Sequence, residues 1–158
     1  LLELKQFELA RTLMYSIHTY FWENGYRSID FEVKDSLLYY LDDQALSAII
    51  WMMLGHTELS LQCYEDLQKF HDKESGLFYH SIKAGGKIDK TFTSYKNGWV
   101  GLALSLAPDD IRQKYLPGLQ KGLQEILFDE QSSLYKFSDS NSTIIADNSM
   151  LALLAMNS

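Results

Sequence analysis

The segment Leu41-Asp42-Asp43-Gln44-Ala45-Leu46-Ser47-Ala48-Ile49-Ile50-Trp51 decides how this chain folds, because its pattern occurs three times. A polar, acidic start precedes an apolar body, which predicts a helix. The other copies are Tyr95-Lys96-Asn97-Gly98-Trp99-Val100-Gly101-Leu102-Ala103-Leu104 and Asp147-Asn148-Ser149-Met150-Leu151-Ala152-Leu153-Leu154. Aligning Gln44, Asn97 and Asn148 places the copies 53 and 51 residues apart, by subtraction of those positions. A helical repeat of this length predicts stacked helical hairpins.

Length and composition fit one soluble globular domain. With 158 residues, 46% of them hydrophobic and 22% charged, we expect a single domain over residues 1–158. The net charge of −7 argues against nucleic acid and anionic membranes as partners. No apolar run reaches the roughly 20 residues that span a bilayer. We expect a soluble protein, with the cytoplasm favoured and a secreted location not excluded.

The sequence gives no reason to expect a metal or another cofactor. Its four histidines are scattered, and none has a second ligand at metal-binding spacing: His18, His56, His71 and His80. The single cysteine, Cys63, cannot form an intrachain disulfide or a Cys-rich zinc site, and we interpret it as a small core residue. His80, next to the Gly85-Gly86 turn, is the histidine that we consider for acid–base chemistry.

The helical pattern begins before the first copy and continues after it. Apolar residues at spacings of three and four predict a helix over residues 1–22, and residues 26–40 form a connector. Strand-like residues occur within this connector: Ile29, Phe31 and Val33. Gly55 ends the first repeated helix, and Thr57 starts a returning helix that reaches about Phe70.

The remaining chain predicts a second hairpin and a final helix. Residues 80–94 form a rim loop whose Gly85-Gly86 turn is flanked by short strands. The second repeated helix covers about 95–107, and a short helical turn starts at Pro108. Pro117 is expected to start a separate returning helix toward Phe128, because proline suits a first-turn position. Residues 138–143 are expected to be an exposed linker before the third repeated helix.

A second phrase recurs independently of the helices. The sequence Asp72-Lys73-Glu74-Ser75-Gly76-Leu77-Phe78 returns as Asp129-Glu130-Gln131-Ser132-Ser133-Leu134-Tyr135, 57 residues later by subtraction. Each predicted unit is therefore a helix, a turn, a returning helix, and a turn of the form Asp-x-x-Ser-small-Leu-aromatic.

Together, these phrases resemble the six-hairpin (α/α) toroid superfamily, whose members include many glycoside hydrolases and sugar epimerases and a toroid domain attached to some thioredoxin-like domains. The matching stretches are 40–45, 72–78, 95–99 and 146–149. The resemblance implies an all-α fold of three helical hairpins with short irregular or strand-like rim loops, about half a toroid. Three alternatives account for the other half: the chain is a fragment, two copies complete a ring as a homodimer, or the terminal helices pair in a smaller bundle.

In that superfamily, the inner helices begin around a central funnel. The resemblance implies that the starts of the repeated helices face a shared cleft: Asp42, Asp43, Gln44, Tyr95, Asn97, Trp99, Asp147 and Asn148. Glycoside hydrolysis needs two carboxyl groups beside the scissile bond. We therefore take Asp42 and Asp43 as candidate acid or base and Asp147 as the candidate second carboxylate. The alternative is that these aspartates only cap their helices.

The other candidates would bind substrate. The amides of Gln44, Asn97 and Asn148 can donate and accept hydrogen bonds to sugar hydroxyls, or they can bridge neighbouring hairpins instead. Tyr95 and Trp99 can stack on a sugar ring or pack in the core. His80 completes the candidate substrate-binding set.

The leading prediction is a carbohydrate-active, glycosidase-like protein that hydrolyses or binds a glycan in this cleft. The alternative is a non-catalytic helical scaffold or binding module that oligomerises or docks a protein partner.

Overall fold

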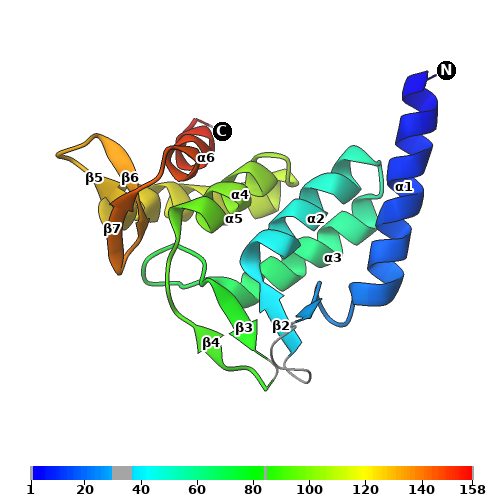
Figure 1. The fold of residues 1–158 in the computed structure, drawn as a ribbon, viewed down its shortest axis with the longest axis horizontal. Helices are drawn as coiled ribbons and strands as arrows, with labels where there is room; N and C mark the ends of the chain where they lie inside the picture. Colours follow the sequence, from blue (N-terminus) through cyan, green and yellow to red (C-terminus); the bar gives the residue numbers. More distant parts are fainter. Residues whose placement is uncertain (1, 30–36, 84, 158) are drawn as a thin grey trace.

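The computed structural model describes residues 2–29, 37–83 and 85–157, and its described part forms six α-helices and two small sheets (Figure 1). The helices are α1 (Leu2–Phe21), α2 (Leu41–Met53), α3 (Thr57–Leu67), α4 (Ser94–Ser105), α5 (Asp109–Gly122) and α6 (Ala146–Met156). The predicted all-α, hairpin-based class is therefore confirmed. Of the strand-like connector residues, Ile29 lies in a strand, whereas Phe31 and Val33 lie outside the described residues.

Both sheets are antiparallel. The first has the order β1 (Ser28–Ile29), β2 (Leu37–Tyr40), β3 (Ser81–Lys83) and β4 (Ile88–Asp89). The second has the order β5 (Phe128–Asp129), β6 (Leu134–Ser138) and β7 (Asn141–Ile144). β2 leads directly into α2, and the turn between β3 and β4 is the predicted Gly85-Gly86 turn. The strands therefore lie next to the amino-terminal ends of the repeated helices.

The three repeated helices form an inner layer. Helix α4 packs against α2 on one side and α6 on the other, while α3 and α5 pack against α2 and α4 (Figure 1). The core between the layers contains fully buried Trp51, Leu77, Leu119 and Leu123. The alternation of inner and outer helices matches the predicted hairpins.

Two glycines allow α4 and α6 to approach closely. A Cβ added to Gly98 would lie 2.8 Å from the Leu151 side chain, and one added to Gly101 would lie 2.1 Å from the Cβ of Ala155. Since contacts advance in the same direction along both chains, the two helices run parallel. The contacts also place Asn148, one turn before Leu151, beside the first turn of α4.

The turn phrase forms the same structure in both copies. Asp72 Oδ2 accepts hydrogen bonds from the Ser75 backbone N–H and hydroxyl, at 3.0 and 2.7 Å. Asp129 Oδ2 accepts the same pair from Ser132, at 2.9 and 2.6 Å. Burial disfavours the charged form of the Asp72 carboxyl, but these donors prevail and lower its pKa below the usual value. The second recurrence in the sequence is thus confirmed as a repeated turn.

A third turn of this kind precedes α2, although its sequence lacks the aspartate and serine. Asn24 has a left-handed backbone, φ 55°, as do Gly76 at φ 76° and Ser133 at φ 57°. In all three turns, the flanking aromatic residues pair across the turn with ring centroids 5.0–5.3 Å apart: Trp22–Tyr26, His71–Phe78 and Phe128–Tyr135. The chain therefore contains three repeats of outer helix, turn, strand and inner helix.

Two boundary predictions were wrong. Pro117 lies inside α5 rather than at the start of a separate helix, and α5 continues as one turn of π-helix over Leu123–Leu127. An interior proline costs about 3 kcal/mol, but this helix buries Leu116 and Leu119 on either side of it. The linker expected at 138–143 is instead part of the β6–β7 hairpin; residues 139–143 are exposed as expected, whereas Ser138 is buried.

Candidate functional site

Two of the predicted amide ligands hold the fold together. Gln44 Oε1 accepts the Tyr26 N–H at 2.7 Å, and its Nε2 donates to the Tyr26 carbonyl at 2.6 Å. Asn97 makes the same pair with Phe78, at 2.8 and 3.0 Å. Both side chains are fully buried. Since each amide is used by a repeated turn, neither is available to a ligand, and the bridging alternative describes these two residues.

The third member of this set is Ser149 rather than Asn148. The Ser149 hydroxyl accepts the Tyr135 N–H at 3.1 Å and donates to the Tyr135 carbonyl at 3.2 Å. Like Gln44 and Asn97, Ser149 is the fourth residue of its helix. The sequence alignment of the third copy was therefore wrong by one residue, because it matched amide to amide and a hydroxyl does the same work.

The starts of α2 and α4 are joined by an ion pair. Lys96 Nζ lies 2.7 Å from Asp42 Oδ1, and the two side chains are only 11% and 22% exposed. The same ammonium lies 4.1 Å from the centroid of the Tyr40 ring, a cation–π contact. The Asp42–Lys96 pair is thus partly shielded from water and lies beside an aromatic ring. It is located at the amino termini of two inner helices, where the sequence analysis placed the candidate site.

His80 adjoins this pair. Its ring meets Tyr40 edge-on, with centroids 5.7 Å apart, and its Nδ1 lies 3.7 Å from Asp89 Oδ2. That distance is too long for a hydrogen bond, and Nδ1 has no other partner among the described residues. Burial, and then the nearby Lys96 charge, lower the pKa of His80 below its ordinary value, against the opposing carboxylates of Asp89 and Asp42. A neutral imidazole can accept a proton at neutral pH.

We call Tyr40, Asp42, His80, Asp89 and Lys96 the mouth cluster. Sequence reasoning missed Tyr40, Asp89 and Lys96. Lys96 had a visible signal, since it is the third residue of its helix as Asp43 is of α2. The pairing of Lys96 with the neighbouring helix depends on the lateral packing of α2 and α4, which no local pattern encodes.

The other candidates lie in the first two turns of α2, α4 and α6. Tyr95 and Trp99 are half-buried and meet edge-on, with centroids 6.4 Å apart. Asp43 is half-buried in the first turn of α2, while Asp147 is exposed in the first turn of α6. Asn148 is 5% exposed, and its Nδ2, like Trp99 Nε1, finds no acceptor among the described residues.

Three surface hollows lie away from the mouth cluster. One lies on α1, one between α1 and the start of α3, and one between α3 and α5. Within the described ranges, no three His, Cys, Asp or Glu side chains gather as a metal site requires. None of the described helices is long and apolar enough to cross a membrane.

No protein-family model and no curated protein sequence matches this chain. Solved structures do match its fold. A sugar epimerase from a ruminal bacterium superposes with a TM-score of 0.71 at 10% identity, over 93% of this chain and 46% of the epimerase. A D-mannose isomerase gives 0.65 at 14% identity, over 94% and 45%. A family 76 glycoside hydrolase from a bovine Bacteroides thetaiotaomicron strain gives 0.63 at 11%, over 80% and 33%.

The fold is half of an (α/α) toroid. The chain spans between a third and a half of the length of these solved enzymes. Its three inner helices, α2, α4 and α6, lie side by side as an arc of such a ring (Figure 1). The resemblance seen in the repeated helix starts is thereby confirmed at the level of architecture.

Proposed function

We propose that this chain binds a carbohydrate at the amino-terminal ends of its inner helices, as part of a glycosidase-like or sugar-isomerising protein. The observation that carries the proposal is the partly buried Asp42–Lys96 pair, which joins two inner helices beside Tyr40 and His80. Charged groups that are shielded from water bind hydroxyls strongly, because charge-assisted hydrogen bonds exceed neutral ones.

We assign roles to the individual residues as part of this proposal. Asp42 and Lys96 would accept from and donate to sugar hydroxyls, and His80 would exchange a proton with the ligand. Asp43 stays a candidate acid or base, and Asp147 the candidate second carboxylate. Tyr95, Trp99 and Asn148 would contact the ring from the α4–α6 side. Glycoside hydrolysis needs two carboxyl groups at a fixed separation, and the pair that we propose for it is Asp147 with Asp42 or Asp43.

Calorimetric titration of mono- and oligosaccharides tests the binding. A ligand that binds only the folded state adds about 2.7 kcal/mol of stability at a concentration of a hundred times its Kd. Asp42→Asn and Lys96→Met should each weaken binding at least about tenfold, equivalent to about 1.4 kcal/mol. Lys121→Met, at an exposed site on α5, is the matched control.

The double variant Asp42→Asn/Lys96→Met should lose less than the sum of the single effects, because the two side chains contact each other. If no sugar binds the wild type, or if both single variants bind as tightly as Lys121→Met, the proposal is wrong. Replacing Asp43 by Asn and measuring glycan turnover then separates hydrolysis from binding.

A second candidate function is a scaffold or docking module without catalysis. Exposed apolar side chains favour it, since Leu9, Leu13 and Met150 are 69%, 59% and 59% exposed. A chain that binds no sugar but associates with itself or with another protein would support this alternative.

A further inference from the structure

The outer helices α1 and α3 occupy equivalent places in the repeat, so their surfaces can be compared directly. Trp22 and His71 begin equivalent turns, which aligns α3 with α1 at a separation of 49 residues, by subtraction. The buried residues agree in this alignment, since Met14 corresponds to Cys63. The outward faces differ. Leu9, Leu13 and Tyr20 of α1 correspond to Glu58, Gln62 and Lys69 of α3.

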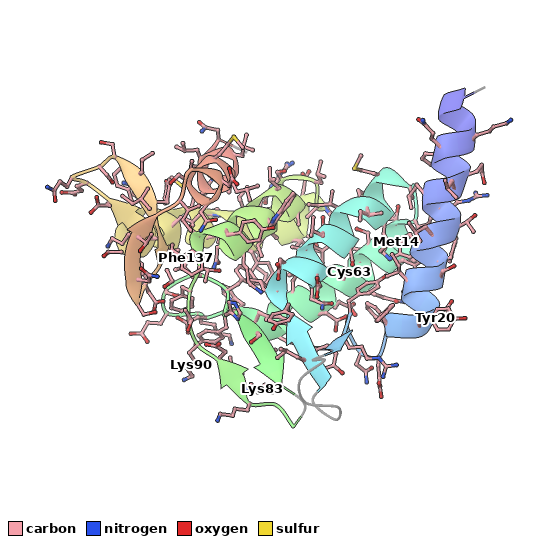
Figure 2. All side chains as sticks on the ribbon, in the orientation of Figure 1. Met14, Tyr20, Cys63, Lys83, Lys90 and Phe137 are labelled. Atoms are coloured by element: carbon pink, nitrogen blue, oxygen red, sulfur yellow. The ribbon has the colours of Figure 1, made fainter. Side chains whose placement is uncertain are left out.

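These positions are solvent-exposed on both helices. On α1, however, they are apolar or aromatic, with Leu9 69%, Leu13 59% and Tyr20 72% exposed. Met14 points toward α2 and α3, whereas Tyr20 points away from the molecule (Figure 2). A helix that carries a second apolar face, apart from the one that packs on its own core, is normally covered on both. Because α3 is polar at the matching positions, the packing of outer helices in a toroid does not explain the outward face of α1.

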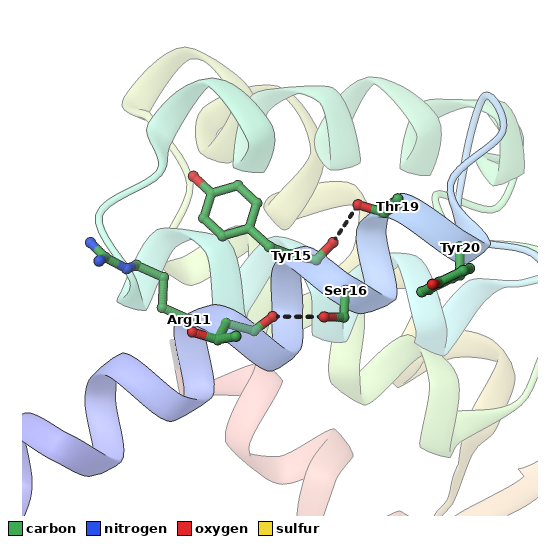
Figure 3. A pocket seen from close by; sticks show the side chains of 6 residues that line it. Arg11, Tyr15, Ser16, Thr19 and Tyr20 are labelled. Atoms are coloured by element: carbon green, nitrogen blue, oxygen red, sulfur yellow. Dashed lines mark hydrogen bonds between the residues drawn. The ribbon is translucent and has the colours of Figure 1, made fainter.

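The outward face also has the shape of a helix-packing surface. Leu9, Leu13, Ser16 and Tyr20 follow spacings of four, three and four, the pattern of a seam between helices. This face includes part of a hollow of about 660 Å³ (Figure 3), which is lined by Arg11, Thr12, Tyr15, Ser16, Thr19 and Tyr20.

Three hydroxyl groups that line this hollow already donate hydrogen bonds within α1. Thr12 donates to the Glu8 carbonyl of its own helix at 2.9 Å. Ser16 and Thr19 donate to the carbonyls of Thr12 and Tyr15 at 3.1 and 2.9 Å (Figure 3). Because these donors are satisfied, Thr12, Ser16 and Thr19 can pack against apolar side chains without leaving a buried hydroxyl donor unpaired.

We propose that this face binds the same face of a second copy of the chain, with the two α1 helices antiparallel. A twofold axis between residues 14 and 15 sets Leu13 of one copy over Ser16 of the other, a large residue over a small one. The same axis sets Leu9 against Tyr20. It also brings exposed Lys5 of one copy near exposed Glu23 of the other, which pairs with Arg27 of its own chain. Opposite charges therefore meet at each of the two symmetric ends of the contact.

The contact uses one helix from each copy and none of the residues proposed for carbohydrate binding. A single helix pair lies at the small end of protein interfaces, below about 1,200 Å². The dimer is accordingly weak and its population depends on concentration.

Sedimentation velocity of residues 1–158, from about 1 μM to about 1 mM, tests the contact. The decisive variant is Leu9→Glu/Leu13→Gln/Tyr20→Lys, which gives α1 the residues that α3 already carries at the same places in the fold. Met150→Gln/Leu153→Gln on α6 is the matched control, because it removes exposed apolar surface elsewhere. Circular dichroism confirms that each variant keeps its helices.

The wild type and the α6 variant should shift from monomer to dimer as concentration rises, whereas the α1 variant should stay monomeric throughout. A wild type that remains monomeric up to the highest concentration overturns the proposal. A dimer that survives the α1 changes, or one that only the α6 changes abolish, also overturns it, and the latter result would assign self-association to the inner-helix face instead.

Discussion

The Asn97 side chain and the main chain of Phe78 exchange two hydrogen bonds, at 2.8 Å to the N–H and 3.0 Å to the carbonyl. The contact ties the turn after one outer helix to the first turn of the next inner helix. Gln44 and Ser149 make equivalent contacts with Tyr26 and Tyr135. The geometry of the helix starts, and of any site built on them, therefore depends on these three pairs of side-chain-to-backbone hydrogen bonds.

Asn97→Ala should destabilise the protein by about 3–5 kcal/mol, because it leaves the buried N–H and carbonyl of Phe78 without partners. Asn157→Ala is the control, since its amide makes one exposed bond to the Leu153 carbonyl. It should cost under about 0.5 kcal/mol. Urea unfolding measures both, and equal losses for the two variants would contradict the structural role of Asn97.

Gly101→Ala and Gly118→Ala should have effects of opposite sign, although both glycines lie inside helices. At Gly101, an added Cβ would lie 2.1 Å from the Cβ of Ala155, so we expect overpacking to cost about 1–3 kcal/mol. At Gly118, the nearest atom is 3.6 Å away, and alanine should add up to about 1 kcal/mol of helix propensity. Thermal unfolding of both variants checks the close packing of α4 on α6. A Gly101→Ala protein as stable as the wild type would show that the helices are further apart.

Trp51→Phe and Trp99→Phe remove the same N–H from different surroundings. Trp51 Nε1 donates to the Tyr26 hydroxyl at 2.7 Å in the core, so its loss should cost about 1–3 kcal/mol. Trp99 Nε1 is buried without an acceptor among the described residues, so its loss should leave stability unchanged or raised. Chemical denaturation of the free protein distinguishes these outcomes. A large loss for Trp99→Phe would mean that its N–H is bonded in solution.

The architecture could be predicted well from the sequence because local patterns of apolar, polar and turn residues specify each element of the repeat. The alternation of inner and outer helices followed from apolar spacing, and the Asp72 and Asp129 turns followed from a shared phrase. The turn at Asn24 was not grouped with the other two, because its sequence lacks the aspartate and serine of their shared phrase. Pro117 was misplaced because the burial of its neighbours outweighs the local cost of proline.

The candidate site was less predictable, since it depends on lateral packing. Polar residues at the helix starts differ in use: Gln44 and Asn97 hold turns, whereas Asp42 is joined to Lys96 across two helices. An amide at a helix start can either hold a turn or bind a ligand. Whether the folded chain buries that amide decides between the two, and the local sequence does not show this. The helix starts could thus be proposed as the site from the sequence, but not which of their residues remain available to a ligand.

The stability of the protein should fall as the pH drops from about 7.5 to about 5.5, the window around the ordinary histidine pKa of about 6.5. Burial is the main cause that lowers the pKa values of His18, His71 and His80 in the fold. Their neutral forms are thus favoured by folding, and the unfolded chain binds more protons below its own pKa. The stabilisation is complete above the unfolded pKa and is lost as the pH falls toward the folded values.

His80→Gln should reduce this pH dependence, because it removes one of the three titrating groups while keeping a polar side chain of similar length. The carboxyls of Asp72 and Asp89, whose pKa values are lowered, titrate below this window and so leave the comparison undisturbed. Thermal unfolding at several pH values measures both slopes. A melting temperature that stays constant or rises on acidification, or a His80→Gln slope equal to that of the wild type, would show that the imidazole beside Lys96 and Asp89 is not held in its neutral form.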